Sequence, residues 1–280
     1  MSFLARLRAL FGQPSWKQRI RLATASHDCD DLPKVPGAGE LTTWQGAPVQ
    51  LMHNGVRVFA GGYHGAPMIE IIRRLRGHHE AQEERVFHEV LSHLPAAATM
   101  LEVGCFWAYY SLWFSHGQPV RRNFLTEPVE WKRRLAELNF ALNKKSVTVD
   151  PYYVAYPGAT LAQTTGAADE SLCEAQPITV DDYLALKGID RLAILHADIQ
   201  GAELALLQGA PTSLADHRID YCFLSTHGEQ HTACLALLET AGYRIIAQHH
   251  PSESFSVDGL IVAAGHQAPF REPIIIGVKD

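Results

Sequence analysis

Two acidic side chains stand where a nucleoside could be held. Glu102 lies in a short apolar run that ends at Gly104, and Glu127 follows the next such run roughly 25 residues later. A glycine at the end of a strand lets a ligand approach the backbone closely, because no Cβ intervenes. A carboxylate at the end of the following strand can accept both hydroxyls of a ribose. The spacing therefore predicts a nucleoside site, although a purely structural turn would also explain Gly104.

The loop after Gly104 narrows the choice of nucleoside. It reads Cys-Phe-Trp-Ala-Tyr over residues 105–109 and lacks the G-x-G-x-x-G pattern of dinucleotide sites. Without that pattern, no run of backbone amides is set up for a pyrophosphate, which counts against NAD and FAD. A cofactor without phosphates, such as S-adenosylmethionine, tolerates this loop better. A nicotinamide-dependent oxidoreductase is therefore the weakest of the alternatives.

Three further polar residues, His196, Asp198 and His227, end later apolar runs. Transfer of a methyl group to a hydroxyl benefits from a base with a pKa of about 7, and histidine is the usual choice. We expect Asp198 to be a site residue, as base, ligand or cofactor contact, and His227 to be the base. For His196, a packing role is the plainer alternative to a catalytic one.

The segment 77–84, Gly-His-His-Glu-Ala-Gln-Glu-Glu, is dense in polar groups. Such a charge run is usually a solvated helix face. The alternative is a substrate-facing lid in which His79 and Glu80 close over the reacting methyl group. A divalent metal could use Asp198, His227 and a carboxylate of this segment. No tight ligand spacing supports such a site, and we predict no metal ligands.

The elements that must position these residues alternate between strand and helix from about residue 99. The apolar runs that predict strands are 99–103, 123–126, 146–149, 192–195, 221–224, 243–247 and 259–263. Alternation with helices predicts a doubly wound parallel sheet. The last two strands are joined by roughly a dozen residues without a helix, which suits an antiparallel pair. We therefore predict an α/β, Rossmann-like, mostly parallel seven-stranded sheet with an antiparallel strand near the C-terminus and helices on both faces.

Residues 1–75 are expected to form an N-terminal extension before a domain of residues 76–280. The extension begins with an amphipathic segment that predicts a helix, followed by a connector over 32–39 that contains proline and glycine. Asn54-Gly55 between apolar runs predicts a β-hairpin over 49–59. We expect the extension to shape the substrate opening or a dimer contact, and residues 254–258 to border the same cleft.

Composition excludes several classes of protein. The chain of 280 residues carries a net charge of −6, which argues against general binding of nucleic acid. Its five cysteines are scattered and show no C-x-x-C spacing, so we expect reduced thiols in a cytoplasmic protein. No apolar run approaches the ~20 residues of a membrane span, so no stable membrane insertion is expected.

Several motifs in residues 80–263 resemble those of the FkbM family of methyltransferases. The family reads Asp-Val-Gly-Ala-Asn-x-Gly-x-x-Ser where residues 102–111 read Glu-Val-Gly-Cys-Phe-Trp-Ala-Tyr-Tyr-Ser. Its Glu-Pro matches residues 127–128, its Val-Thr-Leu-Asp-Asp matches 178–182, and its Leu-Leu-Glu-x-x-Gly-Tyr matches 237–243. The most specific motif is Lys-Ile-Asp-Val-Glu-Gly-Ala-Glu, which resembles His-Ala-Asp-Ile-Gln-Gly-Ala-Glu at 196–203.

The resemblance implies a class I methyltransferase that binds S-adenosylmethionine, and it assigns cofactor contacts. Glu102 and Gly104 would lie by the methionine portion, with Ser111 near the loop. Glu127 would bind the ribose, and Tyr152 and Tyr153 would flank the adenine. For the two tyrosines, plain packing is an equally good interpretation.

The substrate class implied by the family is a hydroxyl of a sugar, glycan or secondary metabolite, which would be O-methylated. An N- or C-methyltransferase is a second interpretation. A catalytically silent nucleoside-binding scaffold is a third. Three departures from the family pattern keep it open: Ala108 replaces a loop glycine, and His196 and Gln200 replace a lysine and a glutamate. Under any of these interpretations the protein could form a homodimer.

Overall fold

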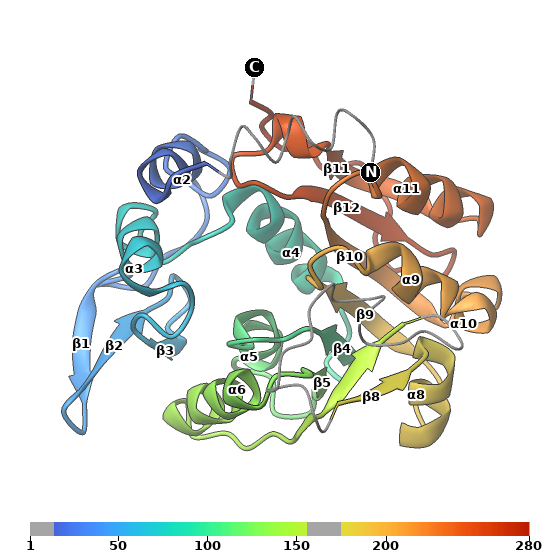
Figure 1. Cartoon of the computed structure of the whole chain (residues 1–280), viewed down its shortest axis with the longest axis horizontal. Helices are drawn as coiled ribbons and strands as arrows, with labels where there is room; N and C mark the ends of the chain where they lie inside the picture. Colours follow the sequence, from blue (N-terminus) through green and yellow to red (C-terminus); the bar gives the residue numbers. More distant parts are fainter. Residues whose placement is uncertain (1–13, 156–174, 280) are drawn as a thin grey trace.

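The computed structural model describes residues 14–155 and 175–279. Its centre is a seven-stranded sheet with the order β11-β12-β10-β9-β4-β5-β6 (Figure 1). The strands are β4 (Thr99–Val103), β5 (Arg122–Thr126), β6 (Val149–Asp150), β9 (Leu192–Ala197), β10 (Ile219–Thr226), β11 (Arg244–His249) and β12 (Gly259–Ala264). Strand β12 runs antiparallel to β10 and β11, and the other neighbours pair in parallel. The predicted sheet, including its reversed strand, is confirmed.

Helices cover both faces of this sheet. One hydrophobic cluster joins α4 (Ala81–His93), α5 (Tyr109–Ser115) and α6 (Glu130–Leu142) to the strand residues Met100 and Ile194. The opposite cluster joins the next residues of the same strands, Leu101 and Leu195, to four further helices. These are α8 (Val180–Lys187), α9 (Glu203–Gln208), α10 (Pro211–Ala215) and α11 (His231–Thr240). Successive side chains of a strand point to opposite faces of the sheet, so each buried strand contributes side chains to both hydrophobic clusters.

The third strand differs from its prediction. It covers only Val149–Asp150, and the chain then forms β7 (Tyr152–Val154), which pairs in parallel with β8 (Gln176–Ile178) in a separate two-stranded sheet. Pro151 stands between β6 and β7, and a proline cannot donate a ladder hydrogen bond. This break turns Tyr152 and its neighbours away from the edge of the main sheet.

The N-terminal extension consists of α2 (Trp16–Ala23), a three-stranded antiparallel sheet and α3 (Gly65–Arg74). The strands are β1 (Leu41–Trp44), β2 (Ala47–Leu51) and β3 (Arg57–Phe59). The β2–β3 hairpin confirms the prediction from Asn54-Gly55, whereas β1 was not predicted. Gln45 and Gly46, both with positive φ, make the two-residue turn before β2. The helix expected at the extreme N-terminus lies outside the described residues.

The extension is tied to the sheet domain through α6. Asn139 is fully buried and accepts a hydrogen bond from the Phe59 amide at 2.9 Å. Its own amide donates to the Trp107 carbonyl at 2.9 Å. Residues of the extension, among them Val58 and Met68, belong to the same hydrophobic cluster as α4, α5 and α6. The boundary at residue 75 therefore stays a prediction, while the described part of the extension shares its core with the sheet.

We expect Asn139→Ala to lower the free energy of unfolding by about 2 kcal/mol, because it leaves the Phe59 amide and the Trp107 carbonyl without partners in the interior. Asn143→Ala is the matched control. That side chain hydrogen-bonds the backbone amide and carbonyl of Arg57, but it is only half-buried, so water can replace it and the substitution should cost less than about 1 kcal/mol. Urea unfolding measures both values. Equal losses would contradict the assignment of Asn139 as the buried anchor.

Candidate active site

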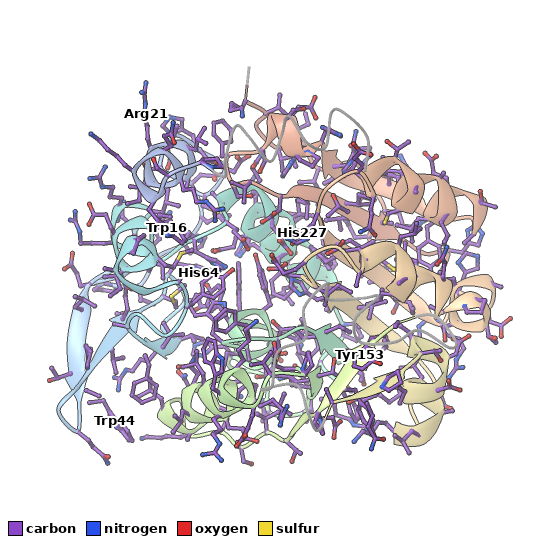
Figure 2. All side chains as sticks on the ribbon, viewed as in Figure 1. Trp16, Arg21, Trp44, His64, Tyr153 and His227 are labelled. Atoms are coloured by element: carbon purple, nitrogen blue, oxygen red, sulfur yellow. The ribbon has the colours of Figure 1, made fainter. Side chains whose placement is uncertain are left out.

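Two cavities meet above the carboxyl ends of the central strands. The first, of about 350 Å³, runs past the ends of β4 and β5 and along β7. The second, of about 330 Å³, lies between the extension and the chain that follows β9 and β10. Four residues line both: Tyr63, His64, Asp198 and Gln200. Of the side chains labelled in Figure 2, Tyr153 belongs to the first cavity, and Trp16 and His227 belong to the second. We call them the cofactor cavity and the acceptor cavity.

Gly104 lines the cofactor cavity, and packing alone requires it to be glycine. Its φ is +72°, and a Cβ there would lie 2.6 Å from the carbonyl oxygen of Asp198. No side chain fits at that distance, because the segments after β4 and β9 pass in direct contact. The structural interpretation of this glycine is therefore sufficient, and its sequence signal does not by itself indicate a ligand.

Glu127 reaches the cofactor cavity from the end of β5. Its carboxylate accepts hydrogen bonds from the amide of Phe106 at 3.2 Å and from the amide of Val129 at 2.9 Å. Burial raises the pKa of this carboxyl above its usual range. A carboxylate has about four acceptor positions, so two of them remain for a ligand. These two free acceptor positions are what the two hydroxyl donors of a ribose require.

Glu102 and Ser111 lie behind the cofactor cavity and do not line it. The Glu102 carboxylate is buried and accepts the backbone amide of Ser111 at 3.0 Å. Burial raises the pKa of Glu102. Ser111 belongs to the first turn of α5, where unpaired amides and the helix dipole favour an anion. The two residues therefore fix α5 against β4, and a direct contact with the cofactor stays a prediction.

The predicted aromatic residues of β7, Tyr152 and Tyr153, both line the cofactor cavity. The ring of Tyr152 also packs edge-on against Tyr183, with the centroids 6.0 Å apart. Packing and ligand contact are thus compatible at this position. The loop opposite them supplies Phe106, which contributes a third aromatic side chain to the lining.

The bulky loop over residues 105–108 packs against the extension. The ring of Trp107 stacks on Tyr63 with centroids 4.7 Å apart and planes 1° apart, and Phe106 meets Tyr63 edge-on at 5.0 Å. Ala108 has a φ of +58°, a left-handed conformation that favours glycine and matches the family's glycine at this position. The aromatic side chains thus find partners in the extension, and the cofactor cavity keeps a volume of about 350 Å³ beside them.

His227, at the end of β10, lies among three carboxylates. Its Nδ1 is 2.8 Å from Glu203, and its Nε2 is 3.1 Å from Asp258 and 3.4 Å from Asp198. Burial would lower the pKa of this histidine, but the hydrogen bonds to Asp258 and Glu203 raise it to about 11. A ring with a carboxylate at each nitrogen holds two protons and has no free lone pair. These contacts favour the protonated imidazolium over a free base, and the expected role of His227 as the base stays a prediction.

Asp198 lies on the wall between the two cavities and is a quarter exposed. Burial, together with the nearby carboxylates of Glu80 and Asp258, raises its pKa to about 7 against the opposing effect of His227. Gln200 donates a hydrogen bond to its Oδ1 at 2.9 Å. A carboxyl with this pKa is partly ionised at neutral pH and can accept a proton there.

His196 is buried and lines neither cavity. Its Nε2 is 2.8 Å from Glu83, which also accepts a hydrogen bond from Ser225 at 3.1 Å, and its ring lies 4.3 Å from that of Tyr110. Although burial lowers the pKa of His196, Glu83 raises it above its usual value. These contacts favour the packing alternative and tie α4 to the sheet.

The segment 77–84 is not a solvated helix face, and that interpretation is wrong. Its polar side chains are buried because each has a partner. His78 and His79 pair with Glu84 inside the segment, whereas Glu83 pairs with His196, and Gln82 with the backbone of residues 255 and 277. His79 and Glu80 line the acceptor cavity, as the alternative interpretation predicted. Nδ1 of His79 lies 2.6 Å from Glu84 and Nε2 lies 3.2 Å from Glu80. Despite burial, which lowers it, the pKa of His79 is raised to about 10 by these two carboxylates.

Several lining residues were not predicted by name. The acceptor cavity is lined by Trp16 and Arg19 of α2 and by Tyr63 and His64 before α3. Ser256, Val257 and Asp258 also line it, in agreement with the expectation for 254–258. The extension thus lines this cavity, and its expected role at the substrate opening stays a prediction.

The cofactor cavity fits S-adenosylmethionine in size and in chemistry. Its volume lies in the range of about 300–1,000 Å³ that small-molecule sites occupy. Glu127 keeps free acceptor positions, and Tyr152 and Tyr153 offer aromatic surface. The carboxyl groups of Glu127 and Asp198 suit a sulfonium cation and disfavour a pyrophosphate.

The described residues contain no helix long and apolar enough to cross a membrane. No curated protein sequence matches the chain. Solved structures of similar fold include a methyltransferase FkbM from Methylobacillus flagellatus KT, at 13% identity and a TM-score of 0.48 over 71% of this chain and 54% of the other. Another is TrmK of M. capricolum in complex with S-adenosylhomocysteine, at 9% identity and a TM-score of 0.43 over 65% and 69% of the two chains.

Family membership follows from the sequence match. The model described as "Methyltransferase FkbM domain" matches residues 90–245, more than half of the chain. The matched range includes β4 with its glycine, the Glu127 strand end and both strands that present Asp198 and His227. The chain belongs to the FkbM family of S-adenosylmethionine-dependent methyltransferases.

Proposed function

We propose that the protein O-methylates a hydroxyl of a small polyhydroxylated acceptor, such as a sugar, a glycan end or a secondary metabolite. The observation that carries the proposal is the position of Asp198 on the wall shared by the two cavities, with a pKa of about 7. A group there can reach an acceptor hydroxyl and is basic enough to take its proton.

The acceptor cavity has the side chains that bind hydroxyls. Glu80, Asp198 and Asp258 supply carboxylate oxygens that accept hydrogen bonds, and Trp16 and Tyr63 supply flat apolar surface. Arg19, His79 and His227 line the same cavity and balance the charge of these carboxylates, so the hydrogen-bond acceptors rather than a net charge favour a hydroxylated substrate. His227 and His79 hold these carboxylates in place through hydrogen bonds.

The chemistry requires alignment and one proton transfer. When bound, S-adenosylmethionine supplies an electrophilic methyl group on a sulfonium sulfur, which departs as a neutral thioether. Glu127 and the tyrosines of β7 would hold it, and the acceptor cavity would direct one hydroxyl oxygen toward the methyl carbon. Asp198 would take the proton of that hydroxyl as its oxygen is methylated. The protonated His227 beside Asp198 stays an ion-pair partner throughout.

The same carboxylates favour one second candidate, N-methylation. An acceptor amine is cationic at neutral pH, and three carboxylates could bind it. It would also have to lose a proton before it could attack, so Asp198 would be needed in both cases.

Product analysis separates the two proposals. The full-length protein is incubated with S-adenosylmethionine labelled with ¹³C in the methyl group, together with neutral sugars, glycosides and amino sugars. Our proposal predicts a new methyl signal with the carbon shift of an ether. A signal with the shift of an N-methyl group would replace it with the second candidate. Label in neither product class, with S-adenosylhomocysteine binding intact, would favour the silent scaffold.

A further inference from the structure

A second cluster of polar side chains lies in the interior, where the extension meets the segment 77–84. Cys29, His78 and Glu84 each present one ligand atom, and these three atoms lie within 4.8 Å of one another. All three residues are at most 4% exposed. None of them lines the acceptor or the cofactor cavity, although Glu84 contacts His79 of the acceptor cavity, so the cluster lies behind the wall of the active site.

We propose that Cys29, His78 and Glu84 bind a structural zinc ion. A thiolate, an imidazole and a carboxylate are all ligands that Zn²⁺ accepts. Metal–ligand bonds of about 2.0–2.3 Å in a tetrahedron separate ligand atoms by roughly 3.3–3.8 Å. The ligand atoms of the cluster lie within 4.8 Å of one another, and Nδ1 of His78 is hydrogen-bonded to Glu84, so these side chains would have to shift for all three to bind one ion.

The charge balance of the interior supports an ion rather than bare ligands. One thiolate and one carboxylate neutralise Zn²⁺, so the filled site carries no net charge, which the buried location favours. Cys29 now donates to the Ala81 carbonyl at 3.2 Å, and it would release its thiol proton when the ion binds. His78 is fully buried, and its Nε2 has no hydrogen-bond partner.

The surroundings hold the ligands in place. One oxygen of Glu84 accepts the amide of His79 at 2.8 Å and lies 2.6 Å from the Nδ1 of that residue, which leaves the other oxygen directed at His78. Gly77 allows the backbones of His78 and His53 to approach, because a Cβ at position 77 would lie 2.2 Å from the His53 amide nitrogen. Such outer contacts are typical of metal sites.

His53 is the nearest candidate for a fourth ligand. Its ring stacks on that of His78 with centroids 4.0 Å apart, and its Nδ1 lies 3.9 Å from the Glu84 carboxylate. At present that nitrogen is 3.0 Å from the hydroxyl of Tyr109. The ion would join the extension, which carries Cys29 and His53, to the start of α4.

Metal analysis of the untagged full-length protein tests the proposal. We expect close to one zinc per chain after gel filtration, and Cys29→Ser and His78→Ala to reduce it below about one tenth. Cys234→Ser is the matched control, because Cys234 is also a buried free thiol but lies on α11, in the other hydrophobic core. The control should keep the zinc.

Cobalt gives a second readout that identifies the ligand. Cobalt(II) in place of zinc should show a thiolate charge-transfer band in the wild type and the Cys234→Ser variant but not in Cys29→Ser. If His78→Ala fails to fold, Cys29→Ser alone decides the matter. A metal-free wild type that takes up neither zinc nor cobalt would overturn the proposal, and so would equal zinc content in the Cys29→Ser and wild-type proteins.

Discussion

The Asp198→Asn substitution is expected to lower kcat by about 10²- to 10⁴-fold, the usual contribution of a general base. The amide keeps the size of the carboxyl group but accepts no proton. Binding of S-adenosylhomocysteine should change by less than about threefold, because Asp198 contributes one part of a large contact surface. Steady-state kinetics with the acceptor found by product analysis, combined with calorimetry, separates the two effects.

The pH dependence of kcat is the most specific test of this prediction. Asp198 acts as a base only when it is ionised, so kcat in the wild type should rise as the pH increases through about 7, the pKa of this group. The residual activity of the Asp198→Asn variant should lack that rise. Asp216→Asn, at an exposed position after α10, is the control and should keep both rate and profile. A variant that retains the wild-type rate and pH profile would remove Asp198 from the mechanism.

The Glu127→Gln substitution is expected to weaken binding of S-adenosylhomocysteine by roughly 100-fold, or about 2.7 kcal/mol. The carboxylate can accept two ribose hydroxyls, and hydrogen bonds to a charged group contribute about 1.5–3 kcal/mol each. Glutamine keeps the shape but loses the charge and one acceptor. Calorimetric titration measures the change in Kd directly.

Glu130→Gln serves as the control for this substitution, since Glu130 lies three residues later, on the exposed first turn of α6, and pairs with Arg134. Its Kd should match the wild type. An unchanged Kd in the Glu127→Gln variant would place the ribose elsewhere, and an equal loss in both variants would indicate a general electrostatic effect.

The sequence predicts the sheet well because the relevant signals are local. Each central strand is a short apolar run with a helix after it, and the hairpin of β11 and β12 follows from a connection too short for a crossover. The two missed features have different causes, one local and one long-range. The β1 turn at Gln45-Gly46 is a weak version of the hairpin signal, and the β7–β8 pair depends on a partner more than 20 residues away.

The sequence predicts part of the candidate site, and there is a physical reason why it could not predict the rest. Glu127, Asp198 and His227 could be identified because parallel strands bring their carboxyl ends to one edge of the sheet. The protonation of His227 could not be predicted, since it depends on Asp258, which joins the site only in the folded chain. The aromatic wall at Tyr63 depends equally on how the extension docks.

Segment 77–84 shows why a run of charged residues can be wrongly interpreted as a solvated helix face. Its composition is that of a solvated helix, and an isolated helix with this sequence would be exposed. In the fold, Glu84 lies between His78 and His79, so each charge has a buried partner. The paired residues are six or fewer positions apart in the sequence. They need to pair only because the packing of α4 against the sheet buries them.

Titration of the purified full-length protein with S-adenosylhomocysteine, with NAD as the control ligand, tests the central claim most directly. Our account predicts one site with a Kd in the micromolar range, no heat with NAD, and the 100-fold weakening in the Glu127→Gln variant. The Glu127→Gln variant is preferable to a substitution of Gly104, whose Cβ would strike the carbonyl of Asp198 and disturb the fold. Absence of binding to a folded wild-type protein would contradict the cofactor assignment of this cavity and, with it, the proposed transfer reaction.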